Sequence, residues 1–444
     1  MEKRHPIKKI VQMQKEGIHK GIYSICSSNH YVIQAAMETA LAEGDYLLIE
    51  STANQVNQFG GYSGMRPRDF KKSIFKIAEK IDFPSSRIIL GGDHLGPLVW
   101  KDEDEHTAMD NAHELIREYV LAGFTKIHID TSMRLAGDDK GTRLASAVIA
   151  ERGTALCNSA VQAFKSLKNS CPQAGPLVYV IGSEVPVPGG SQDAEEKVQV
   201  TKARDFLETV EVFSKTFKRY GLEEIWDDVA AIVVQPGVEF GDDVVHGYNR
   251  EAAKKLCALI KKYPTMVFEG HSTDYQTAFS LRQMVEDGIA ILKIGPALTF
   301  ALREGLFALN IIENELFGHR DKNLSRFIDV LDEAMVNKPE NWKKYYHGSE
   351  EEIRLSRKYS LFDRCRYYLD SKEVKESIKL MISNLRSVEI PLSLISQFMP
   401  LQYRKIRCGD LINDPEEMLK DRIKNCLDDY VYAVSPVSKR KMAY

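Results

Sequence analysis

The stretch RIILGGDH at residues 87–94 decides how the fold is interpreted, because an apolar run ends there directly beside an acid and an imidazole. A barrel enzyme presents a proton-transfer carboxylate next to a metal ligand by placing Asp and His together at the C-terminal end of a strand. A simple turn explains the same letters: Gly91 and Gly92 supply unusual backbone angles, and Asp93 caps the following helix. Taken alone, the stretch favours the turn, so the surrounding sequence has to decide.

Composition predicts a soluble globular chain with a large core. Of 444 residues, 43% are hydrophobic, and 60 basic residues nearly balance 63 acidic ones, for a net charge of −3. This balance gives no electrostatic footprint for nucleic acid or an anionic membrane. The 7 cysteines form no C-x-x-C pair, and neither a signal peptide nor a membrane-spanning run is evident. We expect a cytoplasmic protein.

Short apolar runs alternate with longer amphipathic segments along the first three hundred residues, which is typical of repeated βα units. The strands are expected at 21–25, 46–50, 87–91, 126–130, 177–183, 230–235, 265–269 and 290–294. The helices are expected at 30–43, 67–81, 108–122, 144–166, 198–220, 250–263, 277–287 and 297–317. Eight such units predict a TIM (β/α)8 barrel over residues 1–320, followed by a helical C-terminal extension over 321–444 that packs on it.

Ionisable side chains follow most of these strands, at the end of the barrel where active sites lie. Two imidazoles and a carboxylate from separate strands make an open site for zinc, or for manganese, so we expect His94, Glu184 and His271 to be metal ligands. Gln235 and Asp130 are further candidates, as a ligand or behind one. Asp93 and Glu184 are the candidates for proton transfer to a sugar hydroxyl. Alternatively, Glu184 is a cap and His271 a turn imidazole.

Two groups of loop residues are suited to a phosphorylated sugar. Many neutral hydrogen bonds grip a polyhydroxylated ligand, and barrels bind phosphate at a helix N-terminus after the last strands. The expected substrate contacts are Asn54, Gln55, Asn57, Gln58, Gln235, Asp274 and Lys293. The expected phosphate contacts are Ser272, Thr273, Gly295 and Arg303. An ordinary structured loop remains the alternative at 54–64.

Long and unusual strings of residues carry a resemblance to a known family. They are STANQVNQFGGY (51–62), GGDHLGP (91–97), GSEVPVPGG (182–190), VQPGVEF (234–240), HSTDYQT (271–277), KIGPALTFALRE (293–304), WKKYY (342–346) and SQFMP (396–400). With these strings the chain resembles the tagatose-bisphosphate aldolase GatZ/KbaZ subunit family over nearly its whole length.

The resemblance implies an accessory role in an aldolase. Members of this family are described as partners of a class II aldolase, needed for the activity and stability of the subunit that cleaves tagatose 1,6-bisphosphate in tagatose, galactitol and N-acetylgalactosamine catabolism. Class II aldolases carry an Asp-His pair, matched by Asp93 and His94, and a late histidine, matched by His271. They also carry a metal-binding histidine where this chain has Gln235, which puts standard aldolase activity in doubt.

The resemblance leaves a second function open. Some relatives are described as metal-dependent 4-epimerases, which interconvert D-fructose 6-phosphate and D-tagatose 6-phosphate by retro-aldol and aldol steps. Older descriptions call similar chains tagatose 6-phosphate kinases, but the sequence has no P-loop and no kinase glycine loop. The expected partners are therefore a sugar phosphate and a catalytic aldolase subunit, with self-association left open.

Overall fold

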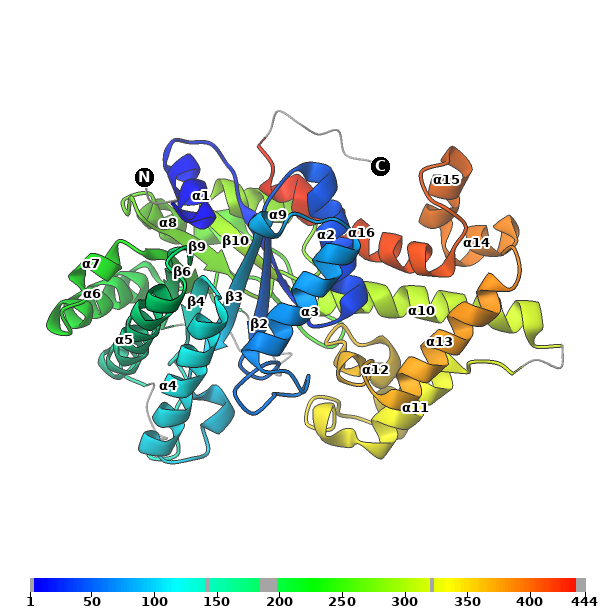
Figure 1. The fold of residues 1–444 in the computed structure, drawn as a ribbon, viewed down its shortest axis with the longest axis horizontal. Helices are drawn as coiled ribbons and strands as arrows, with labels where there is room; N and C mark the ends of the chain where they lie inside the picture. The colour runs from blue at the N-terminus through cyan, green and yellow to red at the C-terminus, as the bar shows by residue number, and fades with distance from the viewer. Residues whose placement is uncertain (1–3, 140–143, 184–197, 320–322, 437–444) are drawn as a thin grey trace.

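The computed structural model describes residues 4–139, 144–183, 198–319 and 323–436, and in these ranges it contains a closed barrel (Figure 1). Its parallel strands follow one another around the ring in the order β1 (Ile22–Cys26), β2 (Leu47–Thr52), β3 (Ile88–Leu95), β4 (Lys126–Ile129), β5 (Val178–Ile181), β6 (Val229–Val234), β9 (Val267–Gly270) and β10 (Ile289–Ile294), and β10 pairs with β1. The predicted TIM barrel is confirmed. Most strand ends lie within one or two residues of the prediction, but β3 continues to Leu95 instead of ending at Gly91.

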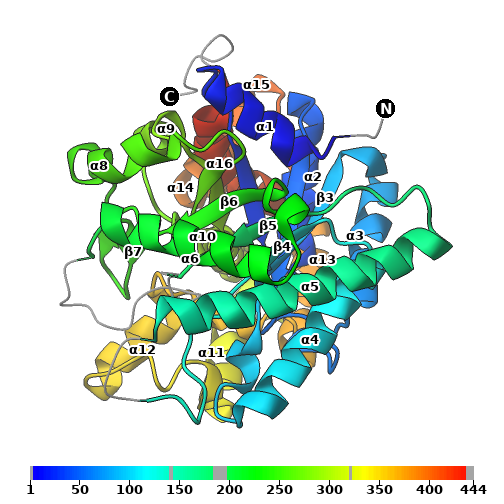
Figure 2. The same cartoon turned by 90° about the vertical axis from the view of Figure 1, so that its left-hand side faces the viewer.

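Helices surround the barrel as predicted (Figure 2). They are α2 (His30–Glu43), α3 (Pro67–Lys80), α4 (Glu105–Ala122), α5 (Ser146–Ser170), α6 (Ala203–Arg219), α8 (Arg250–Ile260) and α9 (Ala278–Glu286). The short helix α7 (Glu223–Trp226) was not predicted, and α10 (Pro296–Phe317), expected as the helix of the eighth unit, instead leads from β10 into the C-terminal extension (Figure 1). Two predicted starts were wrong. The helix expected from residue 108 begins at Glu105, because the Asp104 side chain caps it by accepting the Thr107 N–H. The helix expected from residue 198 begins only at Ala203.

The sequence analysis also missed a helix at the N-terminus and a short hairpin after β6. Helix α1 (Pro6–Lys15) places Ile7, Ile10 and Val11 against the apolar side chains inside the barrel, such as Val178 and Ala230, and so closes its N-terminal end. A two-stranded hairpin of β7 (Glu239–Phe240) and β8 (Val245–His246) follows β6 near the opposite end. The barrel is therefore open to a ligand at its C-terminal mouth.

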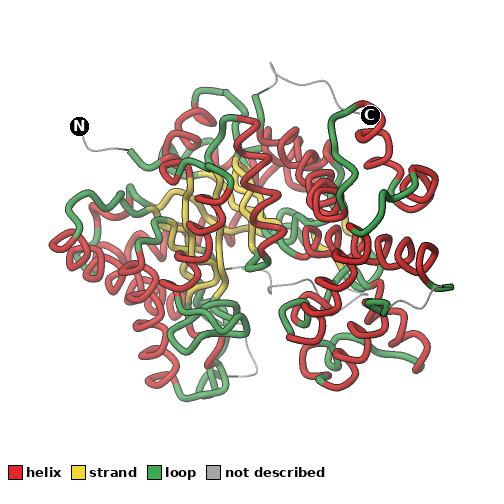
Figure 3. The backbone as a smooth tube through the Cα atoms, turned by 45° about the vertical axis from the view of Figure 1, so that its right-hand side comes forward, coloured by secondary structure: helices red, strands yellow, loops and turns green. Residues whose placement is uncertain are grey.

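The C-terminal extension is helical, as Figure 3 shows. It contains α11 (Phe327–Asn337), α12 (Glu350–Tyr359), α13 (Lys372–Arg386), α14 (Leu392–Phe398), α15 (Pro400–Cys408) and α16 (Pro415–Val434). Short 3-10 helices are η1 (Ser85–Arg87), η2 (Pro97–Trp100), η3 (Pro339–Asn341) and η4 (Arg364–Tyr367). Pro400 and Pro415 each occupy the first position of a helix, where a missing N–H costs nothing.

Helix α16 returns to the barrel and lies between α9 and α2, where the last helix of the ring belongs (Figure 1). Tyr430 donates its hydroxyl to the Thr273 carbonyl at 2.7 Å, and the Gly21 N–H donates to the Val434 carbonyl. The division of the chain at residues 320 and 321 stays a prediction, and the extension contributes this helix to the outer ring. No helix in the described ranges combines the length and apolarity that crossing a bilayer requires.

Candidate metal and sugar-phosphate site

A β-bulge explains how neighbouring Asp93 and His94 both reach the barrel mouth. Side chains alternate between the two faces of a strand, so adjacent residues normally point apart. Between Gly92 and Leu95 the register of β3 against β4 shifts by one residue, and His94 has a φ of +47°, in the left-handed region. A bulge re-aims side chains in this way. Both residues line the same cavity.

Two glycines make this backbone possible. A Cβ on Gly96 would lie 1.8 Å from the Asp130 carbonyl oxygen, so no side chain fits where the chain leaves the bulge. A Cβ on Gly91 would lie 2.8 Å from the Glu50 side chain, so this glycine leaves room for a buried carboxylate. Gly91 of the GGDH motif therefore makes room for Glu50, and Gly96 lets the chain pass Asp130 after the bulge.

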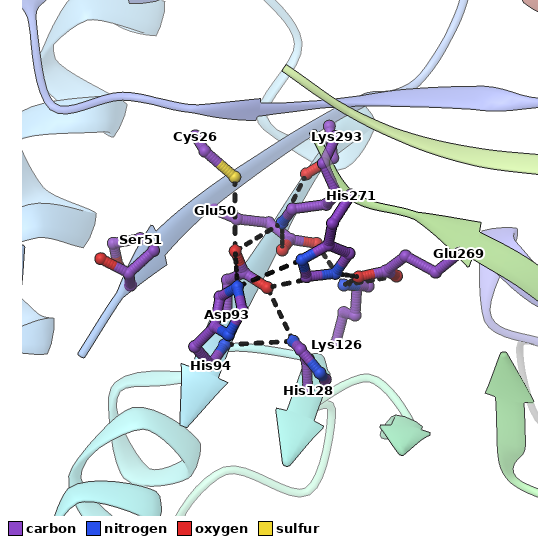
Figure 4. A network of polar contacts seen from close by, with 12 residues as sticks. Cys26, Glu50, Ser51, Asp93, His94, Lys126, His128, Glu269, His271 and Lys293 are labelled. Carbon is purple, nitrogen blue, oxygen red and sulfur yellow. Dashed lines mark hydrogen bonds and ion pairs between the residues drawn. The ribbon is translucent and has the colours of Figure 1, made fainter. Parts of the chain in front are cut away.

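Three imidazoles surround the Asp93 carboxylate (Figure 4). The ring centroids of His94 and His271 lie 4.8 Å apart, and each lies 5.1 Å from that of His128 on β4. Asp93 Oδ1 lies 2.7 Å from His128 Nδ1 and 4.0 Å from His271 Nε2, and its Oδ2 lies 3.9 Å from His94 Nε2. All four side chains are buried, so their charges are weakly screened.

Carboxylates behind two of these rings fix their orientation. Asp130 Oδ2 lies 2.9 Å from His94 Nδ1, and Glu269 Oε1 lies 3.0 Å from His271 Nε2. Burial raises the pKa of Asp130, but the hydrogen bond and charge of His94 outweigh it and lower the value to about 2. Burial lowers the pKa of His271 to about 4. The arrangement is that of metal-binding histidines held by carboxylates.

A layer of buried ion pairs lies below the histidines. Lys126 Nζ lies 2.6 Å from Glu50 Oε1 and 2.9 Å from Glu269 Oε2. Lys293 contacts Glu50 and lies 3.0 Å from Asp93 Oδ2. Burial raises the pKa of Asp93, but Lys293 and the histidines outweigh it and hold the value well below its usual range. Asp93 is therefore an anion beneath the mouth.

The nitrogen atoms fit a divalent cation. With their other nitrogens bonded to carboxylates, His94 Nε2 and His271 Nδ1 face each other at 3.1 Å. His128 Nδ1 accepts the backbone N–H of His94, and Asp93 Oδ1 lies beside the same nitrogen. His128 Nε2 is buried without a partner among the described residues. Facing acceptors of this kind need a proton or a cation between them.

The charges fit as well. Four buried carboxylates in this cluster (Glu50, Asp93, Asp130 and Glu269) meet two ammonium groups (Lys126 and Lys293), so with neutral imidazoles the cluster is two negative charges in excess. A divalent cation would neutralise that excess, and an uncompensated buried charge is costly. Asp93, His128, Glu269 and His271 each offer a ligand atom within 4.8 Å of the others. This group could bind a metal.

The cluster opens into a cavity of about 360 Å³ at the mouth, within the range of small-molecule sites. The barrel contributes charged and neutral polar groups, including Asp93, Asn54 and Gln55. The extension contributes Asn341, Lys344, Tyr345, Arg364, Arg366 and Tyr367. The Tyr62 and Tyr367 rings meet edge to face at 4.7 Å, which joins the loop after β2 to the extension.

The sequence-predicted residues fall into four groups. Asn54, Gln55, Asp93, His94, His271, Ser272, Asp274, Lys293 and Gly295 line the cavity. Asp130 lies behind His94, as described above. Glu184 lies outside the described residues, so its expected roles as a metal ligand and in proton transfer stay predictions.

The remaining predicted residues do not line the cavity, and each makes at least one polar contact within the protein. Gln235 accepts the N–H groups of residues 237 and 238, and Asn57 accepts those of residues 59 and 61. Gln58 donates to the Asn111 carbonyl. Thr273 donates to the Lys293 carbonyl, and buried Arg303 pairs with an aspartate of the extension. These side chains shape the loops around the cavity.

Sequence reasoning missed His128, Glu50, Lys126 and Glu269. A signal for three of them exists in the period of the strands: Lys126, His128 and Asp130 alternate with Ile127 and Ile129, and Glu269 precedes His271 by two. Residues two apart share a face, so these polar residues point into the barrel. Nothing in the sequence marks the cavity residues of the extension, because their neighbours come from distant segments.

Comparison with known proteins gives long matches. The family described as D-tagatose-1,6-bisphosphate aldolase subunit GatZ/KbaZ-like matches residues 7–435. D-tagatose-1,6-bisphosphate aldolase subunit GatZ of Salmonella gallinarum is 45% identical over 430 residues, or 97% of this chain and 99% of that protein. The protein of the same name from Klebsiella pneumoniae is 45% identical over 429 residues, with the same coverage.

A solved structure is also similar to this chain over most of its length. It is described as a probable tagatose 6 phosphate kinase from Sinorhizobium meliloti 1021. It is 42% identical to this chain with a TM-score of 0.84, and the match covers 94% of this chain and 100% of that one. The similarity therefore extends through the barrel and the extension.

Proposed function

Because this chain belongs to the D-tagatose-1,6-bisphosphate aldolase subunit GatZ/KbaZ-like family, we propose that it is a subunit of such an aldolase and supports the activity and stability of a catalytic class II partner. The observation that carries this proposal is the 45% identity to GatZ subunits across 97% of the chain. No large insertion or missing segment separates this chain from proteins of that name. The substrate class that follows is a phosphorylated ketose.

The cavity supports a sugar-phosphate ligand and a metal, which we propose to be zinc. His128 and His271 would hold the ion together with His94 beside them, because imidazole is a preferred zinc ligand, and Asp93 and Glu269 offer carboxylate oxygens at the same place. When bound, such an ion polarises a carbonyl oxygen and stabilises the negative charge of an enediolate.

The protein's own groups would orient the sugar. Asp93 is ionised on the cavity wall and can accept a hydrogen bond from a sugar hydroxyl or hold its proton. Asn54 and Gln55 offer neutral donors and acceptors to other hydroxyls. The Lys293 ammonium keeps the Asp93 carboxylate in place.

The test is reconstitution with a catalytic class II subunit. Cleavage of tagatose 1,6-bisphosphate is followed with and without this chain, together with the half-life of the partner's activity at 37 °C. We expect the chain to raise both, and no effect on either contradicts the proposal. His94→Ala and His271→Ala distinguish support of the partner through a protein interface from a contribution of the metal site. Support through an interface alone should survive both changes.

The same preparation tests the epimerase alternative. The zinc-loaded chain is incubated alone with tagatose 6-phosphate, and the products are resolved by chromatography. The accessory role predicts no fructose 6-phosphate. Its appearance, and its loss in His271→Ala, would assign catalysis to this chain itself.

A further inference from the structure

Two arginines of the extension lie on the cavity wall without carboxylate partners. Arg364 and Arg366 both belong to η4 and both line the cavity. Among the residues that the structure describes, no carboxylate oxygen lies within 4.0 Å of either guanidinium, whereas Arg303 nearby pairs with Asp363 at 3.1 Å. Arg364 is buried and Arg366 is half-buried, and buried cations are normally paired, so these two charges call for an anion that the described residues do not supply.

Arg364 is fixed in place with its terminal nitrogens unused. The residue is 5% exposed, and its guanidinium lies between two rings, 3.7 Å from the centroid of Tyr345 and 4.5 Å from that of Tyr367. Its Nε donates to the Asn341 carbonyl at 2.6 Å. Its two terminal nitrogens have no hydrogen-bond partner within the described ranges. A planar guanidinium held by aromatic rings is preorganised to bind the oxygens of a phosphate.

Arg366 brings a second positive charge beside the first. One of its terminal nitrogens donates to the backbone carbonyls of Phe362 and Asp363, and the other lies 3.0 Å from the Tyr367 hydroxyl. Neutral partners position this guanidinium but leave its charge uncompensated. Both guanidinium groups lie against the Tyr367 ring, 4.5 and 4.6 Å from its centroid, and two like charges on one ring repel each other unless an anion binds beside them. Exposed Lys344 adds a third cation to the same cavity.

The usual phosphate position of a barrel is already taken. The first N–H groups of α10, which follows β10, point at Asp274: its Oδ1 accepts from Gly295 at 3.0 Å and from Ala297 at 2.8 Å. This carboxylate occupies the place of a phosphate at the helix N-terminus. A phosphorylated ligand in the cavity must therefore find its cations elsewhere, and in the described wall η4 and Lys344 offer them, since Lys293 is paired with Glu50 and Asp93.

We propose that Arg364 and Arg366 bind the terminal phosphate of a phosphorylated ketose, so that the C-terminal extension supplies the anion site of the cavity and the barrel supplies the metal site. The identity of the sugar rests on the function proposed above, and the phosphate chemistry rests on η4. Asp363 holds η4 against α10 by accepting from Thr299 at 2.6 Å and from Arg303.

The experiment measures binding to the full chain without any partner subunit. Titration calorimetry of the zinc-loaded protein uses D-tagatose 6-phosphate, unphosphorylated D-tagatose and inorganic phosphate as probes. The variants are Arg364→Gln, Arg366→Gln and the charge-conserving Arg364→Lys. Arg354→Gln, a change at an exposed arginine of α12, is the matched control. Circular dichroism and the unfolding midpoint establish that each variant is folded.

Each arginine change to glutamine should weaken binding of D-tagatose 6-phosphate and inorganic phosphate about tenfold or more, because a charged hydrogen bond contributes about 1.5–3 kcal/mol. Binding of D-tagatose should change less than threefold, Arg364→Lys should recover part of the loss, and Arg354→Gln should bind as the wild type does. Unchanged phosphate affinity in folded Arg364→Gln and Arg366→Gln overturns the proposal. So does an equal loss for both sugars.

The outcomes separate this proposal from the proposed function. Arginine-dependent phosphate binding without any effect on a partner aldolase would contradict only the subunit role. Support of the partner without arginine-dependent phosphate binding would contradict only the anion site. If the variants lost partner support but kept phosphate affinity, the arginines would serve a protein interface and the anion site would be refuted.

Discussion

Replacing Lys126 with Met should destabilise the barrel strongly, because this ammonium joins two buried carboxylates. The side chain is 0% exposed, and its Nζ lies 2.6 Å from Glu50 and 2.9 Å from Glu269. Methionine has a similar length but leaves both carboxylates with one cation fewer. Removing one partner of a buried ion pair costs about 3–5 kcal/mol. That is a large part of the roughly 5–15 kcal/mol by which typical proteins are stable.

The assay is equilibrium unfolding in urea at pH 7, monitored by circular dichroism on metal-free protein, so that metal affinity does not enter the comparison. Lys254→Met is the matched control, since Lys254 lies 3.2 Å from Glu251 with both side chains more than 70% exposed. Exposed pairs contribute little, and we expect no measurable change there. The double change Lys126→Met with Glu269→Gln should regain part of the loss. A Lys126→Met protein within about 1 kcal/mol of the wild type would refute the argument.

Three further predictions concern metal binding, the dependence of stability on acidic pH, and the bulge in β3. His128→Ala and His271→Ala should each lower bound zinc well below the wild-type stoichiometry in equilibrium dialysis with elemental analysis; full retention would exclude that histidine as a ligand. Burial, and then Lys8, lower the pKa of His5 to about 3 from 6.5, so its contribution to stability is complete above pH 6.5 and is lost as the pH falls towards 3. His5→Asn should therefore flatten that part of the stability profile in urea unfolding, and an unchanged slope would contradict it. Gly96→Ala should lose soluble folded protein, because its Cβ would lie 1.8 Å from a carbonyl oxygen, whereas Gly137→Ala, with no atom within 4 Å, should express normally.

Much of the fold was predictable from local pattern. Short β-branched runs alternating with amphipathic segments gave the eight barrel strands, because each strand of a parallel barrel must be apolar and each covering helix must bury one face. Helix α1 was missed because it plugs the barrel end, outside the βα repeat. The place of α16 was missed because no local signal tells a helix which distant helices it will contact.

The site was predictable where its residues follow a strand. Asp93, His94 and His271 were expected at the mouth, and they line one cavity there. His128 lies inside β4 and not after it, so the expectation that site residues follow strand ends did not include it. Arg303, a predicted phosphate contact, faces Asp363 instead, because a helix placed after β10 can turn any of its faces towards the extension.

The sequence by itself determined the barrel, the family and the polar residues at the ends of the strands, since hydrophobic period and strand order are local and repetitive properties. Only the tertiary structure decided that Asp93 and His94 point the same way, because a bulge in pairing with β4 turns them. Only the tertiary structure brought Arg364 and Arg366 to the wall of the cavity that Asp93 also lines. The physical reason is that burial and charge pairing depend on which distant segments come together. Here Asp93 of the barrel and the arginines of η4 line one cavity although some 270 residues separate them in the sequence.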